Sequence, residues 1–262
     1  MKQAIFQMDI VAGKPELNRL RVGKWIKETV EAEHPDIVIL PEMWTTAYTL
    51  PELELYADRD GEPTTGFLQG LAKNYKINII GGSFANKKEG KVYNSSIVVN
   101  CNGDIVYQYD KIHLVPMLNE PQYLAGGTEK VKVFELDGVK MGVIICYDLR
   151  FPELSRSLAL QGAQILYVVA EWPSVRLGHW QALQIARAIE NQYYVVSCNR
   201  VGSYDGETFA GSSMIINPWG NSLRIGSEKL EETITASLSL NLVTKIRKDV
   251  PVFDSRMPDL YE

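Results

Sequence analysis

Apolar residues gather along the chain in short uninterrupted runs that are typical of buried strands. Residues 37–40 form one such run, apolar without alternation, which is the pattern of a strand that lies in a parallel sheet and is covered on both faces. Four further segments resemble it, so the strand prediction extends to residues 4–8, 77–83, 165–170 and 193–199.

The longer segments between these runs repeat their apolar residues at roughly helical intervals. In the first of them, Leu17, Leu20 and Trp25 belong to one apolar stripe. Helices are therefore predicted over residues 15–33, 65–75, 152–162 and 179–191.

Tight turns add antiparallel pairs to this pattern. Asn102-Gly103 and Asp137-Gly138 are two-residue turns of the kind that joins hairpins, and strands are predicted on both sides of each. A third hairpin is predicted around residues 218–221, followed by a strand over residues 232–240. Strands and helices that alternate, with hairpins between them, indicate an α/β fold with one mixed sheet or two sheets covered by helices.

Length and charge limit the possible classes of protein. The 262 residues can bury one large core and contain no linker, so we predict a single domain over 1–262, with 241–262 as a short helix and tail that contacts another subunit. The net charge of −5 and the scattered basic residues argue against a nucleic-acid partner. No apolar run approaches the roughly 18 residues of a membrane helix, and no signal peptide is recognisable, so we expect a cytoplasmic protein with no membrane partner.

The cysteines and histidines do not form a metal site. Cys101, Cys146 and Cys198 are odd in number, lie far apart and contain no CxxC pair. This usage suits a reducing compartment and argues against disulfides and against zinc. No two of the three histidines have metal-ligand spacing, so no bound metal is expected.

Three chemically capable residues follow three predicted strands. Glu42 comes after the run at 37–40, Lys111 follows the strand after Asn102-Gly103, and Cys146 follows the strand after Asp137-Gly138. Chemistry in α/β sheets gathers at the carboxyl ends of strands. Each residue alone is commonplace, and a strand-end cysteine is often a small buried hydrophobe. A carboxylate, an ammonium and a thiol in three equivalent positions nevertheless predict one site.

The sequence around Cys146 strengthens this prediction. Asp148 is predicted as a helix N-cap, Pro152 fits the first turn of a helix, and Glu153 favours a helix N-terminus, so the segment is predicted to be a strand-turn-helix elbow. A thiol at such an elbow lies near the positive end of a helix dipole, and a nearby Lys111 adds to that field. The thiolate form is therefore expected to be favoured.

Other polar residues near this segment receive structural interpretations. Arg150 and Glu153 are interpreted as a local ion pair that braces the elbow. His113 is interpreted as structural, and His179 is expected to form a local hydrogen bond at the start of its helix.

The chain resembles the carbon-nitrogen hydrolase (nitrilase) superfamily nearly from end to end. The Glu-Lys-Cys triad of that family is matched by LPEMW at Glu42, YDKIHL at Lys111 and ICYDLRFPEL at Cys146. The segment EWPSVRLGHWQALQIARAIEN makes the chain most similar to the omega-amidase branch. This resemblance implies a four-layer αββα sandwich, homodimers or larger homo-oligomers, and hydrolysis of a small carboxylate-bearing amide such as 2-oxoglutaramate or 2-oxosuccinamate without a cofactor.

The resemblance also implies a role for each site residue. Glu42 acts as general base, Cys146 attacks the amide carbonyl to form a thioester, and Lys111 stabilises the oxyanion. The supporting and substrate-binding residues that we expect are Glu120, which orients Lys111, the backbone N–H of Tyr147 at the oxyanion, Arg176 or else Arg150 on the substrate carboxylate, and Trp172 and Tyr48 as apolar walls.

Two other classes of function remain open from the sequence. A thiol protease would use Cys146 with His113 or His179 as base, although its local signatures are missing. A non-catalytic binding or assembly protein would keep the fold alone. Within the hydrolase class, a deaminated-glutathione amidase, a carbamoylase or a nitrilase would use the same triad.

Overall fold

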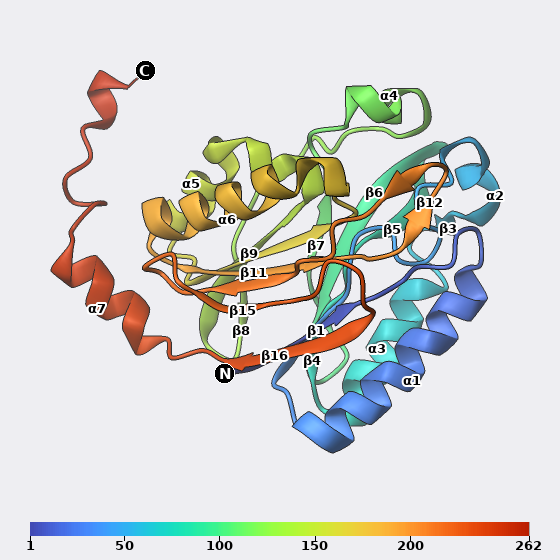
Figure 1. The fold of residues 1–262 in the computed structure, drawn as a ribbon, viewed down its shortest axis with the longest axis horizontal. Coiled ribbons are helices and arrows are strands. Elements are labelled where there is room, and N and C mark those ends of the chain that lie inside the picture. The colour runs from blue at the N-terminus through green and yellow to red at the C-terminus, as the bar shows by residue number, and fades with distance from the viewer. Residues whose placement is uncertain (262) are drawn as a thin grey trace.

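Two β-sheets lie face to face between two layers of helices (Figure 1). The computed structural model describes residues 1–261. One hydrophobic cluster fills the space between the sheets, with Ile5 and Ile39 from one sheet against Val143 and Val169 from the other. The predicted αββα sandwich is confirmed.

The first sheet has eight strands in the order β16-β1-β2-β4-β6-β5-β3, with β7 paired to β6 beside this path. Strands β1, β2 and β4 are parallel, whereas β16 runs antiparallel to β1, and β6 runs antiparallel to β4, β5 and β7. The carboxyl ends of β2 and β7 therefore point to the same edge. The strands are β1 (Lys2–Gln7), β2 (Ile37–Ile39), β3 (Asp58–Arg59), β4 (Asn78–Ile80), β5 (Phe84–Lys88), β6 (Lys91–Val99), β7 (Ile105–Asp110) and β16 (Glu232–Ser237).

The second sheet has six strands in the order β15-β14-β11-β10-β9-β8. Its centre, β9-β10-β11, is parallel, and antiparallel strands flank it on both sides. The strands are β8 (Phe134–Leu136), β9 (Val139–Ile145), β10 (Ile165–Ala170), β11 (Tyr194–Asn199), β14 (Met214–Ile216) and β15 (Ser222–Ile225). A separate two-stranded ribbon consists of β12 (Ser203–Tyr204) and β13 (Glu207–Thr208).

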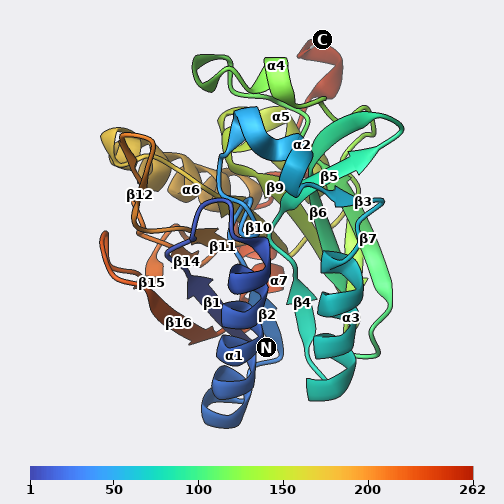
Figure 2. The ribbon, with the colours of Figure 1, turned by 90° about the vertical axis from the view of Figure 1, so that its right-hand side faces the viewer.

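Helices cover the outer face of each sheet, which explains why the central strands lack alternation. In β1, Ile5 faces the other sheet, whereas its neighbours Ala4 and Phe6 pack with Ile26 of α1 and Leu68 of α3. Figure 2 shows α1 and α3 side by side over the first sheet, and α5 and α6 cover the second. These helices are α1 (Pro15–Glu33), α3 (Thr64–Tyr75), α5 (Pro152–Leu160) and α6 (Leu177–Asn191).

The predicted helices and hairpins are confirmed with shifts of a few residues at their ends. Short elements in long connections were not predicted, because one-turn helices and two-residue strands carry too few residues for a periodic pattern. They are α2 (Leu53–Tyr56), α4 (Glu120–Tyr123), 3₁₀ turns at Leu50–Glu52, Pro116–Leu118 and Ser174–Arg176, β3, and the β12-β13 ribbon. The five-residue strand β5 was not predicted either.

The C-terminal segment leaves the sandwich after β16. It forms α7 (Asn241–Asp249) and a 3₁₀ turn at Pro258–Leu260, and Figure 1 shows its end reaching away from the body of the molecule. Arg247 of α7 donates to the carbonyl of Ala163 over 2.6 Å, which ties the helix to the second sheet's layer. Over residues 1–261, no helix has the length and apolar character needed to cross a membrane.

Candidate active site

The three strand-end residues meet in the space where the two sheets adjoin. Glu42 follows β2 and Lys111 follows β7, both in the first sheet, whereas Cys146 follows β9 in the second. The sequence predicts that these strand ends share a site, and the structure brings them together from two sheets instead of from three neighbouring strands. The face-to-face packing of the sheets therefore positions the thiol opposite the charged pair.

Lys111 is the centre of the charged group. Its side chain is fully buried, and its ammonium donates to Glu42 Oε1 over 3.0 Å, to Glu120 Oε1 over 2.9 Å and to the Tyr48 hydroxyl over 2.9 Å. Burial lowers the pKa of Lys111, but the two carboxylates outweigh burial and raise this pKa well above its usual value. The lysine is therefore a permanent cation.

Glu120 is buried beside this cation at the start of α4. Its second carboxylate oxygen accepts the backbone N–H of Val115 over 2.7 Å. One oxygen of Glu120 accepts from Lys111 and the other accepts from the backbone of Val115, so Glu120 holds the lysine ammonium in place. Its side chain has no contact with solvent.

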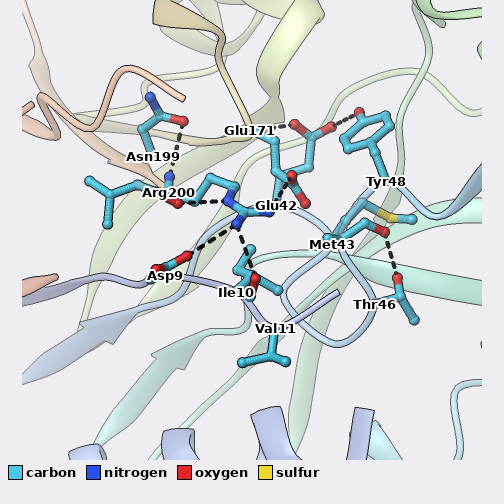
Figure 3. A network of polar contacts seen from close by, with 12 residues as sticks. Asp9, Ile10, Val11, Glu42, Met43, Thr46, Tyr48, Glu171, Asn199 and Arg200 are labelled. Carbon is cyan, nitrogen blue, oxygen red and sulfur yellow. Dashed lines mark hydrogen bonds and ion pairs between the residues drawn. The ribbon is translucent and has the colours of Figure 1, made fainter. Parts of the chain in front are cut away.

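Glu42 has no contact with solvent, and its two oxygens are used unequally. Oε1 accepts from Lys111, from the Tyr48 hydroxyl over 2.6 Å and from the Asn94 amide over 2.8 Å. Oε2 accepts the backbone N–H of Glu171 over 2.7 Å, and Figure 3 shows Glu42 between Tyr48 and Glu171. The expected role of Tyr48 as an apolar wall is thus incomplete, because its hydroxyl bonds to both members of the ion pair.

Cys146 lies at a strained point of the chain. Its φ of +48° falls in the left-handed region, directly after β9 and at the start of a 3₁₀ helix, Cys146–Arg150, that leads to α5. A non-glycine residue in this region costs about 1–3 kcal/mol and persists only where its surroundings hold it. The predicted elbow is therefore present and is under strain at the thiol-bearing residue itself.

The thiol of Cys146 is buried, and its protonation differs from our expectation. Burial and the neighbouring Glu42 carboxylate raise its pKa well above the usual value, and the opposing effect of Lys111 is smaller. The prediction of a favoured thiolate is wrong, first because the thiol is buried, and second because two carboxylates but only one ammonium act on the sulfur. The resting form is a neutral thiol that needs a base.

Asp148 is buried and stabilises the elbow in a way that the sequence did not indicate. It is not a helix N-cap, since α5 begins after Phe151 without a side-chain cap. Its carboxylate accepts the Tyr109 hydroxyl over 2.6 Å, the backbone N–H of His113 over 3.0 Å and that of Ile145 over 3.2 Å. These donors come from both sheets, so Asp148 fastens the elbow to the segment that carries Lys111.

Neither His113 nor His179 is paired with the Cys146 thiol, as the base of a thiol protease would be, and Arg150 is a partner of His179. His113 places Nδ1 2.8 Å from Asp148 and stacks on Phe151, in agreement with its structural interpretation. Arg150 approaches His179 Nδ1 at 3.4 Å, and its guanidinium lies over the ring of Trp172. The expected ion pair between Arg150 and Glu153 does not occur among the described residues.

A hollow opens in front of Cys146. Two arginines line it, Arg150 from the elbow and Arg176 from the 3₁₀ turn Ser174–Arg176. The remaining predicted substrate contacts also line it, and they are Tyr147, Trp172 and Tyr48. Within residues 1–261, no cluster of three histidine, cysteine or acidic side chains could hold a metal ion.

Comparison with known proteins identifies the family of this chain. The family model described as carbon-nitrogen hydrolase matches residues 2–248. This chain belongs to the carbon-nitrogen hydrolase family. As a member, it hydrolyses carbon–nitrogen bonds other than peptide bonds, and the resemblance stated from the sequence is confirmed.

Individual relatives of this carbon-nitrogen hydrolase support the same placement. It is 43% identical over 255 residues to a protein of Bacillus subtilis (strain 168) named 2-oxoglutaramate amidase, with 97% of each chain covered. It is 34% identical over 254 residues to omega-amidase NIT2 of Xenopus tropicalis, covering 93% of this chain and 91% of that one. The crystal structure of Saccharomyces cerevisiae Nit3, a member of branch 10 of the nitrilase superfamily, matches with a TM-score of 0.90 at 28% identity, covering 98% of this chain and 96% of that one.

Two residues of the hydrolase site escaped the sequence reasoning. Asn94 lies within β6 and bonds to Glu42, and only its polarity inside a long strand distinguished it. Glu171 follows β10 directly, so the strand-end rule that found Glu42 would have found it as well.

Proposed function

We propose that this hydrolase is an amidase that converts a small carboxylate-bearing amide, of the 2-oxoglutaramate or 2-oxosuccinamate type, to the acid and ammonia. One observation carries the proposal: Cys146 lines a hollow that two arginines also line, and the charges of the buried Glu42–Lys111 pair act on its thiol. The thiol and the carboxylate supply the chemistry, and the arginines supply a partner for an anionic substrate. The relative named 2-oxoglutaramate amidase supports this choice of substrate.

In the proposed first step, Cys146 gives its proton to Glu42 and its sulfur attacks the amide carbonyl. Oε1 of Glu42 already accepts three hydrogen bonds, whereas Oε2 accepts one. Since a carboxylate oxygen offers about two lone-pair sites, Oε2 keeps the free position for the thiol proton. Proton transfer to a positioned base is needed because the thiol is neutral at rest.

In the remaining steps, the tetrahedral intermediate releases ammonia, which takes the proton from Glu42. The carbon–nitrogen bond breaks and the carbon–sulfur bond remains, so the product of this half-reaction is a thioester on Cys146. Water then gives its proton to Glu42 and attacks the thioester, which frees the acid and restores the thiol. The charge of Lys111 and the backbone N–H of Tyr147 stabilise the oxyanion in both halves, and one such donor is typically worth about 10²–10³ in rate.

The substrate's carboxylate is expected to bind a guanidinium. Arg176 and Arg150 both line the hollow, and the planar fork of an arginine fits a carboxylate through two parallel hydrogen bonds. We propose Arg176 as the principal partner, because the ring systems of Trp172 and Tyr147 already occupy the guanidinium of Arg150.

The test is ammonia release by the purified protein. The panel contains 2-oxoglutaramate, glutamine, an N-carbamoyl amino acid and a simple nitrile, with Cys146→Ala as the inactive control. Deaminated glutathione is tested beside them by release of 2-oxoglutarate, because hydrolysis of its substituted amide frees an amine and no ammonia. Preference for 2-oxoglutaramate supports the proposal, and preference for another compound replaces the substrate while keeping the mechanism. Turnover by Cys146→Ala would refute the mechanism.

The two rival classes make different predictions in the same assay. A non-catalytic protein releases ammonia from none of the panel. A thiol protease would keep its activity in Glu42→Gln, but both histidines are tied to other residues, His113 to Asp148 and His179 to Arg150. That arrangement favours the carboxylate as base.

We further propose a cytoplasmic homo-oligomer. All three cysteines are free thiols, as suits a reducing compartment. The C-terminal segment, which ends in the exposed Met257, Leu260 and Tyr261, is the proposed contact with another subunit. Light scattering of the full chain and of a form truncated after residue 250 tests this role of the segment.

A further inference from the structure

Glu171 is a buried carboxyl group with one oxygen to spare, and the proposed reaction does not use its side chain. Oε2 accepts from the guanidinium of Arg200 over 3.1 Å, while Oε1 is shielded from solvent and has no hydrogen-bond partner within residues 1–261. Figure 3 shows the Glu171 side chain between Arg200 and Glu42. A buried polar atom without a partner costs about 1–3 kcal/mol, so its position calls for a function.

The surroundings of Glu171 place it against the substrate. It lines the hollow that contains Cys146 and also an adjoining hollow of about 110 Å³ that contains Tyr204 and Phe209. Its backbone N–H holds Glu42, so the side chain extends from the same point of the chain that positions the proposed base. A substrate whose amide reaches Cys146 therefore passes Glu171 with the rest of its length.

Arg200 holds the Glu171 carboxyl group in place through an ion pair. The arginine is fully buried and donates also to the carbonyls of Ile10 and Val201, so that it cannot follow a substrate into the hollow. Its guanidinium lies over the ring of Phe209 at 4.4 Å. The pair is thus held rigidly at the wall of the hollow, and Oε1 is the one oxygen of Glu171 that has no partner within residues 1–261.

We propose that Glu171 is a substrate contact, in which the uncharged carboxylic acid donates a hydrogen bond from Oε1 to the oxygen-rich, anionic end of the amide. This inference rests on the proposed function, because it presumes an anionic substrate. It adds a donor that distinguishes 2-oxo acid amides, which offer acceptor oxygens, from amides with an ammonium in the same place. A charged Glu171 would repel the former and attract the latter.

The charges around Glu171 favour the neutral acid. Burial is the largest effect and, together with the Glu42 charge, outweighs the opposing effects of Arg200 and Lys111, so that the pKa of Glu171 is raised to about 8. The other charged or titratable residues of the two hollows are Tyr48, Cys146, Tyr147, Arg150, Arg176, Tyr204, Asp205 and Glu207. At pH 7 the acid form predominates, and it is lost as the pH rises through 8.

The pH dependence of kcat/KM tests this inference. With an anionic amide, kcat/KM of the wild type should fall about tenfold between pH 7 and pH 9, since only the acid form donates. Glu171→Gln keeps a donor that does not titrate, so its kcat/KM should stay near the wild-type value at pH 7 and remain flat to pH 9. Glu135→Gln, at an exposed carboxylate on β8 that lines neither hollow, is the matched control and should retain the wild-type fall.

A neutral amide such as butyramide separates substrate contact from an effect through Glu42. The fall should be absent with butyramide, because that amide has no anionic end. If butyramide shows the same fall, or if Glu171→Gln retains it, the inference is overturned. If Glu171→Gln loses activity at pH 7 while the wild type gains activity toward pH 9, the ionised form is the functional one and the inference is likewise overturned.

Binding of the product supplies a measurement that does not depend on turnover. Calorimetry of 2-oxoglutarate binding at pH 8.5, in buffers of different ionisation enthalpy, should show uptake of about 0.8 proton by the wild type and none by Glu171→Gln. No proton uptake by the wild type would overturn the inference even if the variant folds poorly. If 2-oxoglutaramate is not a substrate, the proposed function fails by the ammonia assay, and the pH test is repeated with whichever anionic amide is hydrolysed.

Discussion

Replacing Asp148 by Asn should loosen the elbow that carries Cys146. The carboxylate accepts hydrogen bonds from Tyr109, from the N–H groups of His113 and Ile145, and lies 2.8 Å from the His113 ring. An amide of the same shape keeps one acceptor oxygen and turns an NH₂ group toward donors. Hydrogen bonds to a charged group are worth about 1.5–3 kcal/mol each, so the loss of two should cost about 3 kcal/mol of unfolding free energy.

The functional consequence should exceed what instability alone produces. Cys146 keeps a φ of +48° only while its neighbours hold it, and Asp148 holds the residue directly before it. We expect kcat to fall about 10- to 100-fold at temperatures where the variant is fully folded, since misplacing the nucleophile by about 1 Å has that scale of effect.

Urea unfolding and steady-state ammonia release measure the two effects of Asp148→Asn. The matched control is Asp104→Asn, which removes the same charge at an exposed turn where the carboxylate accepts only from Asn100. That control should change the unfolding free energy by less than about 0.5 kcal/mol. An Asp148→Asn protein as stable and as active as the control would refute the reasoning.

Three further substitutions test the site itself. Glu42→Gln should abolish amide hydrolysis and yet speed alkylation of Cys146 by iodoacetamide, because the Glu42 charge contributes to the raised pKa of the thiol; slower alkylation would contradict this. Tyr48→Phe removes the donor 2.6 Å from Glu42 and should lower kcat about tenfold with little change in KM; an unchanged kcat, measured by ammonia release, would make Tyr48 a packing residue. Arg176→Gln should raise KM for anionic amides about 10- to 100-fold and leave neutral amides unaffected, whereas the matched Arg150→Gln should have the smaller effect; the reverse order would exchange their roles.

The strand ends of this protein were predictable because one rule covers them. A strand that is apolar throughout must be buried on both faces, and the first polar residue after it emerges at a common edge. Glu42 and Cys146 were found in this way, and Glu171 follows β10 by the same rule. The order of elements and the hairpin turns were equally accessible, since their signals are local.

The contacts that join distant segments were not predictable from local patterns. The sequence does not say that β9 belongs to a different sheet from β2 and β7, so it could not say from which side the thiol approaches. Asp148 was predicted to be a helix N-cap because its spacing to Pro152 fits one. In the structure its carboxylate instead accepts hydrogen bonds from buried donors of both sheets. The protonation of Cys146 was misjudged for a related reason, since it depends on the number of charges gathered around the sulfur.

The contacts of Lys111 constrain how the oxyanion is stabilised. An ammonium has three hydrogens, and all three are engaged by Glu42, Glu120 and Tyr48. Lys111 therefore acts on the carbonyl oxygen through its charge, or by releasing the neutral Tyr48, and not through a donor held in reserve. The two carboxylate contacts are charge-assisted and stronger, so the Tyr48 hydroxyl is the partner most easily exchanged for a developing oxyanion. In this exchange the third N–H of Lys111 would donate its hydrogen bond to the substrate oxygen instead of to Tyr48, and only as charge appears on that oxygen. An interaction of this kind favours the transition state over the bound amide.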